Sequence, residues 1–193
     1  MADVSTSAGV GTRPMRADAR RNYDRLVEAA RAVFAARGSE ASIDEIARTA
    51  DVGVGTLYRH FPRRIDLVEA VYREDVDTLV ARGEALMTRA APWDALARWL
   101  EAFVAYAAAK RTFLTELHEA FEKNPDLAVS SREKIGAATG RLLTRAQEAG
   151  VVRPDISQSD LMQLVGGMCM ARGATEEQNL GLLTFVLDGI RPR

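Results

Sequence analysis

A short helical segment after position 53 carries hydrogen-bond donors along one side. On a helical wheel its apolar residues form a single arc, which we expect to be buried: Val54, Leu57, Tyr58 and Phe61. The opposite side is small, polar and cationic: Gly53, Thr56, Arg59 and His60. Hydroxyl, guanidinium and imidazole groups donate hydrogen bonds to phosphates and base edges, and a glycine lets a backbone approach closely. This side of the segment therefore suits contact with a nucleic acid.

Other residues with catalytic or metal-binding chemistry are sparse. Cys169 is the only cysteine, and the two histidines, His60 and His118, have no zinc-ligand spacing. A Cys–His pair of Cys169 with His118 stays open, although nothing supports it, and a cysteine in an apolar helix usually serves packing. The Gly53-Val54-Gly55 segment lacks the third glycine and the preceding strand of a nucleotide loop. We therefore predict no metal, no cofactor and no enzymatic reaction.

Charge is unevenly distributed along a chain of ordinary globular composition. The 193 residues are 47% apolar and 27% charged with a net charge of −1, a balance that excludes disorder of the whole chain. Residues 13–37 hold seven arginines against three acids, and residues 52–64 hold three arginines and no acid. The longest uncharged stretch, Leu161–Ala171, has 11 residues, whereas a membrane span needs about 20. The first residues are too polar for a secretory signal, so we expect a cytoplasmic protein without membrane contact.

Helical spacing recurs along almost the whole sequence, while alternating strand patterns are nearly absent. The pattern predicts an all-α fold. Helix starts are indicated by cap signals at Ser42-x-x-Glu45, Pro92, Ser157-x-x-Asp160 and Thr175-x-x-Gln178. We expect a flexible basic tail over residues 1–18, a helix-turn-helix unit over 19–65 and a larger helical domain over 66–193.

Residues 42–67, SIDEIARTADVGVGTLYRHFPRRIDL, resemble the DNA-binding region of TetR/AcrR-family transcriptional regulators. The resemblance covers roughly residues 20–70, and these positions are in register: Ile46-Ala47, Ala50, Val52, Gly55, Leu57-Tyr58, His60-Phe61 and Leu67. It implies an all-helical homodimer of about nine helices, three for DNA and the rest for a ligand cavity and the dimer interface. It also implies that an effector bound in the cavity releases the operator.

The sequence departs from the family pattern at three positions. Asp51 stands where glycine is usual, and aspartate tolerates the left-handed backbone conformation that the turn requires. Gly53 replaces a frequent serine, so the phosphate contact of that serine is made by a backbone N–H instead or is lost. Arg64 replaces a frequent lysine and can still meet a phosphate.

Carried over residue by residue, the resemblance implies DNA contacts from two helices, the turn between them and the start of the next helix. The candidates are Ser42, Gly53, Val54, Gly55, Thr56, Tyr58, Arg59, His60 and Arg64. A looser analogy adds Arg16, Arg20 and Arg21, which would reach the DNA backbone or minor groove. Packing remains an alternative role for Tyr58, and Arg63 is interpreted as a solvated charge.

The C-terminal part of the sequence is rich in aromatic residues and methionines that serve either as core or as cavity lining. The candidate ligand-binding residues are Trp99, Phe103, Tyr106, Phe113, His118, Phe121, Met162, Met168 and Arg172, and Glu116 is a further polar group in this region. The ligand would be mostly hydrophobic, with an aromatic compound as one option. The last two helices are apolar on more than one side, which predicts a two-fold dimer interface from Leu161, Leu164, Val165, Leu182, Phe185 and Val186.

The sequence therefore favours a DNA-binding repressor that is released from a pseudopalindromic operator by a small-molecule effector. Its partners would be double-stranded operator DNA, a second copy of the chain and the effector. Two alternatives stay open: a helical small-molecule-binding protein or enzyme without DNA binding, and a helical interaction protein.

Overall fold

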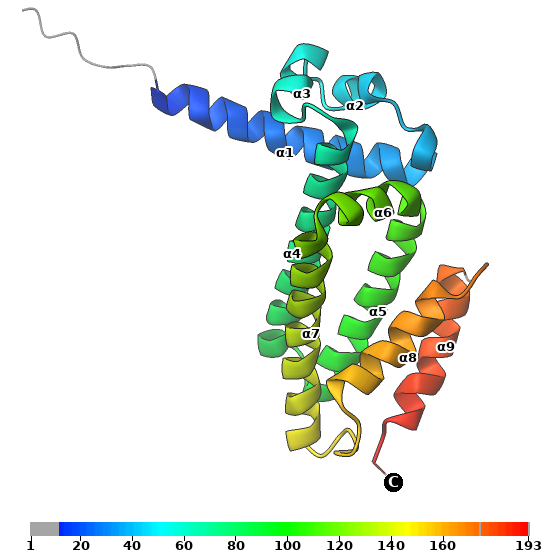
Figure 1. Cartoon of the computed structure of the whole chain (residues 1–193). Coiled ribbons are helices and arrows are strands. Elements are labelled where there is room, and N and C mark those ends of the chain that lie inside the picture. Colours follow the sequence, from blue (N-terminus) through cyan, green and yellow to red (C-terminus); the bar gives the residue numbers. More distant parts are fainter. Residues whose placement is uncertain (1–11, 174, 193) are drawn as a thin grey trace, which may run out of the picture.

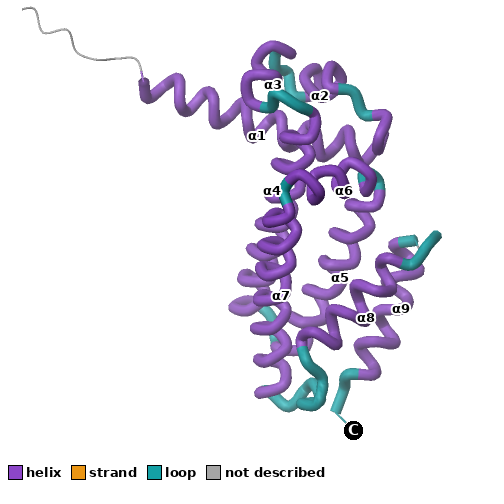
Figure 2. The backbone as a smooth tube through the Cα atoms, viewed as in Figure 1, coloured by secondary structure: helices purple, strands orange, loops and turns teal. Residues whose placement is uncertain are grey.

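Nine α-helices and one short 3-10 helix, with no strand, make up the part of the chain that the structure describes (Figures 1 and 2). The structure is a computed structural model that describes residues 12–173 and 175–192, with side chains from residue 17 onward. The elements are α1 Thr12–Arg37, η1 Gly38–Glu40, α2 Ile43–Thr49, α3 Val54–His60, α4 Arg64–Arg89, α5 Pro92–Arg111, α6 Leu114–Lys123, α7 Pro125–Glu148, α8 Gln158–Met170 and α9 Glu176–Gly189. The predicted all-α class is confirmed.

Helix α1 begins earlier than expected. Residues 12–18 are helical, so the predicted flexible tail over 1–18 is wrong for these positions, and residues 1–11 lie outside the described residues. Pro14 is compatible with this start because the first-turn N–H groups of a helix have no intrahelical acceptor.

Local sequence signals account for several helix starts. Reciprocal caps form between Ser157 and Asp160 at α8 and between Thr175 and Gln178 at α9, and Pro92 is the first residue of α5. At α2 only half of the expected capping box forms. Ser42 Oγ accepts a hydrogen bond from the Glu45 N–H at 3.1 Å, whereas the Glu45 carboxylate lies 3.6 Å from Arg37.

Helices α1, α2 and α3 gather at one end of the molecule, and α4 runs from this end along the rest of the bundle (Figure 1). Helix α4 packs against α1 on one side and against α5, α6 and α7 further along, while α8 and α9 pack on α5. No helix in the described ranges is both long and apolar enough to cross a bilayer. Helix α4 belongs to both parts of the molecule (Figure 1).

One hydrophobic core extends through both parts. Leu26, Phe34, Ile46 and Leu57 are fully buried among α1, α2 and α3. In the bundle, the fully buried Trp99 donates from Nε1 to Thr139 Oγ1 at 3.0 Å. Gly83 permits this packing, because a Cβ at that position would lie 2.8 Å from the indole ring.

Candidate functional site

The connection between α2 and α3 is fixed by an arginine of α1. Asp51 adopts the left-handed conformation with φ +50°, as predicted from its tolerance of this region. Arg25 donates to the Asp51 carbonyl oxygen at 3.0 Å and to its carboxylate at 2.9 Å. Gly53 then caps α3 with an extended backbone. Sequence reasoning missed Arg25, since no local pattern indicates a contact across 26 positions.

Helix α3 presents an open face at the end of the molecule. Leu57 and Phe61 are buried as predicted, but Val54 and Tyr58 are 37% and 49% exposed. The expectation that these two side chains are buried is therefore wrong, because α3 is only two turns long and packs along the line of Leu57 and Phe61. Arg59 is exposed and forms no hydrogen bond or ion pair with any residue in the described part of the chain.

The remaining predicted contact residues have mixed environments. Ser42, Gly53 and Gly55 are exposed and Thr56 is half-buried. His60 is half-buried, with its ring centroid 6.2 Å from those of both Tyr23 and Phe61. The exposed surface of α3 is thus formed by the arc containing Val54, Gly55, Tyr58 and Arg59 more than by His60.

The arginines near the start of α1 are exposed and paired within their own helix. Arg20 lies 3.2 Å from Asp24, and Arg21 pairs with Asp18. Such exposed pairs contribute little to stability, so these guanidinium groups can exchange their partners for phosphates at low cost. The side chain of Arg16 lies outside the described side chains.

Arg64, a predicted phosphate contact, lies at the start of α4. Its guanidinium donates to the carbonyl oxygens of Ala41 and Ser39, lies 3.2 Å from the Glu116 carboxylate and sits 5.1 Å from the centroid of the Phe34 ring. Arg64 therefore contacts α6 while its side chain stays 30% exposed, and its phosphate contact remains a prediction from the sequence. It links the three-helix end of the molecule to the bundle.

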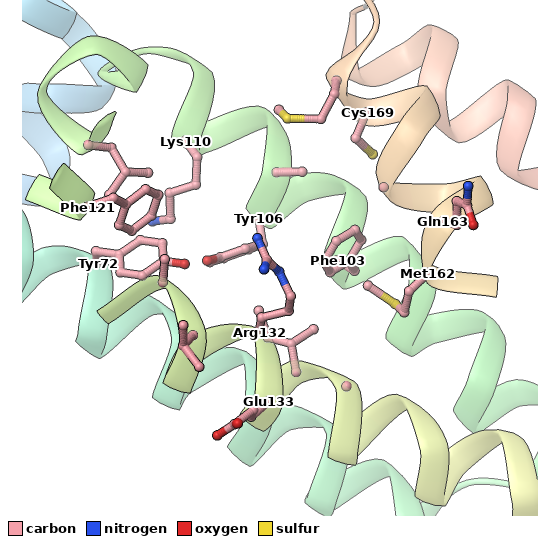
Figure 3. A pocket seen from close by; sticks show the side chains of 18 of the residues that line it. Tyr72, Phe103, Tyr106, Lys110, Phe121, Arg132, Glu133, Met162, Gln163 and Cys169 are labelled. Carbon is pink, nitrogen blue, oxygen red and sulfur yellow. The ribbon is translucent and has the colours of Figure 1, made fainter. Parts of the chain in front are cut away.

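A cavity of about 910 Å³ lies among α4, α5, α6, α7 and α8 (Figure 3). Four of the predicted ligand-binding residues line it: Phe103, Tyr106, Phe121 and Met162. Sequence reasoning did not single out Tyr72, Lys110 and Arg132, which also line it. The helical periodicity of the sequence does not indicate that these three residues line the same cavity.

Five predicted ligand-binding residues lie away from this cavity. Trp99 is fully buried and bonded to Thr139, and Phe113 packs on Phe34 with ring centroids 5.5 Å apart. His118 and Arg172 are exposed, and Met168 is half-buried on α8. These placements correct the predictions, because residue type alone does not distinguish core, surface and cavity positions on a helix. Glu116 is likewise engaged with Arg64 and does not line the cavity.

Lys110 is a buried cation at one end of the cavity. Only 5% of it is exposed, and its ammonium group pairs with Asp75, which also accepts from Arg31 Nε of α1 at 2.6 Å. The ammonium lies 4.9 Å from the ring centroid of Tyr106 and 5.6 Å from that of Tyr72. Burial lowers the pKa of Lys110, and the attraction of Asp75 opposes this shift. The Arg31–Asp75–Lys110 triad thus joins α1 to the cavity wall.

Exposed apolar side chains gather on α8 and α9. Leu164 is 53% exposed, Leu182 46% and Phe185 74%, and Met170 and Leu180 add to this surface. Leu161 and Val165 are fully buried within the chain, so their predicted place in a dimer interface is corrected, while Val186 is half-buried. Leu164, Leu182 and Phe185 of the predicted set thus face outward, whereas α8 turns its Leu161 side to the core.

Two family models match this sequence. Residues 26–71 match the family described as bacterial regulatory proteins, tetR family. Residues 91–192, just over half of the chain, match the C-terminal domain of SbtR-like transcriptional regulators. The chain belongs to the TetR family of transcriptional regulators. In this TetR-family regulator, α2 and α3 are the helix-turn-helix that binds DNA.

Solved structures and curated relatives agree with this assignment. The chain is 37% identical to the TetR transcriptional regulator SCO0520 of Streptomyces coelicolor, with a TM-score of 0.78 over 88% of this chain and 98% of that chain. It is 34% identical to a TetR transcription regulatory protein of Mycobacterium vanbaalenii, with a TM-score of 0.72 over 93% and 100%. It is 25% identical to the HTH-type transcriptional regulator UidR of Escherichia coli (strain K12) over 78% of this chain and 79% of UidR.

Proposed function

We propose that this TetR-family regulator represses transcription as a homodimer that binds a pseudopalindromic operator and leaves it when a mostly apolar small molecule occupies the cavity. The open face of α3, with Arg59 exposed and unpaired within the described residues, carries the proposal. A guanidinium on a helix that fits the major groove can bond a guanine edge in bidentate fashion.

The proposed DNA contacts come from α3 and from the residues before it. Val54, Gly55, Thr56, Tyr58 and Arg59 would face base edges, with Ser42, Gly53 and His60 at the backbone. Arg16, Arg20 and Arg21 would follow the phosphates beside the recognition site. Arg64 is not among the proposed contacts, because its guanidinium is held by Glu116 and two backbone carbonyls.

The exposed apolar surface of α8 and α9 supports pairing of two chains. Leu164, Leu182 and Phe185 are large, apolar and exposed, as expected where helices of two protomers form a four-helix arrangement. A two-fold axis then sets the two α3 helices about 34–36 Å apart, or a multiple of this distance, on a palindromic site.

Two polar connections support communication between cavity and DNA. Arg64 bridges to Glu116 on α6, and the triad of Arg31, Asp75 and Lys110 bridges α1 to the cavity wall. A ligand that displaces α6 or Lys110 would alter the orientation of the helix-turn-helix. Each tenfold loss of operator affinity requires that the ligand favour the released state by about 1.4 kcal/mol.

A gel shift with the DNA that flanks the regulator's own gene tests this proposal. We expect a discrete complex with two protomers per site. Random DNA of equal length should compete poorly with the operator for the protein. Equal competition by random DNA would contradict operator recognition and favour the alternative of a helical small-molecule-binding protein without DNA function. Compounds that dissolve the complex can then be screened.

A further inference from the structure

Three charged residues line the cavity: Lys110, Arg132 and Glu133. Arg132 extends from α7 into the cavity near Tyr106, whereas the neighbouring Glu133 points away from it (Figure 3). Arg132 forms no hydrogen bond or ion pair with any residue in the ranges 17–173 and 175–192. Lys110 contributes the second cation at the same wall. Arg132 is exposed and unpaired within these ranges, so its guanidinium is available to a ligand in the cavity.

Two of the aromatic residues that line the cavity already contact a cation. Tyr72 and Tyr106, which could surround a ligand ammonium, already surround the ammonium of Lys110 at 5.6 Å and 4.9 Å. Phe113, which lies outside the cavity lining, is 5.3 Å from the same ammonium. A ligand cation at this end of the cavity would therefore meet repulsion from Arg132, which is unpaired in the described part of the chain. Aromatic surface remains elsewhere in the cavity at Phe103 and Phe121.

Two phenols lie beside these cations. The hydroxyl groups of Tyr72 and Tyr106 point toward one another near Lys110 (Figure 3). Burial raises the pKa of Tyr106 far above its ordinary value, so its hydroxyl stays protonated and can donate a hydrogen bond. The polar end of the cavity thus offers donors, and its other walls are apolar, with Phe103, Ile135 and Met162 among them.

We propose that the effector is an apolar monocarboxylate whose carboxylate pairs with Arg132 and accepts a hydrogen bond from Tyr106. Its apolar body lies along Phe103, Ile135 and Met162. A guanidinium fork matches the two oxygens of a carboxylate, which favours this group over a neutral alcohol. The inference rests on the proposed function of the cavity as the effector site.

Three probes with one tail and different head groups test the charge preference: 6-phenylhexanoate, 6-phenylhexan-1-ol and 6-phenylhexylamine. Isothermal titration calorimetry on the full chain is expected to give an affinity for the acid about tenfold or more above that for the alcohol, with the amine weakest. Arg132→Gln is expected to remove this preference and leave the affinity for the alcohol unchanged. Arg141→Gln is the matched control, because Arg141 is exposed on the same helix and pairs loosely with Glu84 outside the cavity.

Several results would overturn the inference. They are an amine or alcohol that binds as tightly as the acid, an equal loss of acid and alcohol in Arg132→Gln, and no binding of any probe up to its solubility limit. A gel shift with each probe keeps the two proposals separate. If the acid binds through Arg132 but does not release DNA, the inferred ligand class stands, and the proposal that a bound ligand releases the operator is contradicted. If the operator itself is not bound, the calorimetry still decides the ligand class.

Discussion

Asp75→Asn removes the carboxylate that balances the buried ammonium of Lys110. The Lys110 side chain is 6% exposed and that of Asp75 14%, so the ammonium would be left without a counter-charge in a desolvated space. Removing one partner of a buried ion pair costs about 3–5 kcal/mol. In a protein of this size each kcal/mol corresponds to about 2–4 °C in Tm, so we expect a loss of about 6–20 °C.

The loss of stability in Asp75→Asn depends on pH in a defined direction. Burial lowers the pKa of Lys110 below its ordinary 10.5, and loss of Asp75 lowers it further, because Asp75 is the group that opposes the shift. The unfolded chain then keeps its proton to higher pH than the folded chain, so stability rises as pH increases from the folded pKa toward 10.5. The deficit of Asp75→Asn relative to the unmodified protein is therefore largest near neutral pH and shrinks at alkaline pH.

Urea unfolding followed by circular dichroism, at neutral and at alkaline pH, measures both effects. Asp77→Asn is the matched control on the same helix, because it removes only an exposed pair with Lys134 and should cost at most about 1 kcal/mol. The double variant Asp75→Asn/Lys110→Met should recover most of the stability, since no buried charge remains. A single variant within about 1 kcal/mol of the unmodified protein, or a double variant less stable than the single, would refute this reasoning.

Three further predictions follow from other parts of the structure. Gly83→Ala should lower the free energy of unfolding by about 1–3 kcal/mol, because the added Cβ lies 2.8 Å from Trp99, as measured by urea unfolding. Phe185→Glu should convert the proposed dimer to monomers in sedimentation experiments, because Phe185 is 74% exposed on the apolar surface of α9. Arg64→Ala should leave the slope of log operator affinity against log salt unchanged, because its guanidinium faces Glu116 rather than phosphate.

Each of these has a clear contrary result. An unchanged or higher stability of Gly83→Ala would show that the helices separate easily around Trp99. A dimeric Phe185→Glu would place the interface elsewhere. Leu114→Glu, which changes an exposed apolar residue on α6, is the control and should leave the oligomeric state unchanged. A salt slope that falls by about 1.8 in a dimer of Arg64→Ala would restore Arg64 as a phosphate contact.

The sequence predicted well those features that depend on neighbouring residues. The caps at Ser157 and Thr175, the proline at the start of α5 and the turn at Asp51 all form as expected, because each depends on local backbone geometry. The helical wheel of α3 failed at Tyr58, since a two-turn helix buries only the narrow line that its neighbours cover.

Features that depend on distant contacts could not be predicted from periodicity. Arg64 meets Glu116 across 52 positions, and Arg31 meets Asp75 across 44. The cavity shows the same limit: Trp99 and Phe103 lie one turn apart on α5, yet the first is core and the second lines the cavity. The assignment of each aromatic residue required the packing of five helices.

Fluorescence anisotropy with labelled operator DNA tests the central claim that α3 recognises DNA through its open face. Arg59→Ala should weaken binding to the operator by about 1–3 kcal/mol per recognised base pair and reduce its preference over a scrambled sequence. Arg98→Ala, an exposed arginine on α5, should bind as the unmodified protein does. If Arg59→Ala and the unmodified protein discriminate equally between operator and scrambled DNA, the account of recognition by α3 is contradicted.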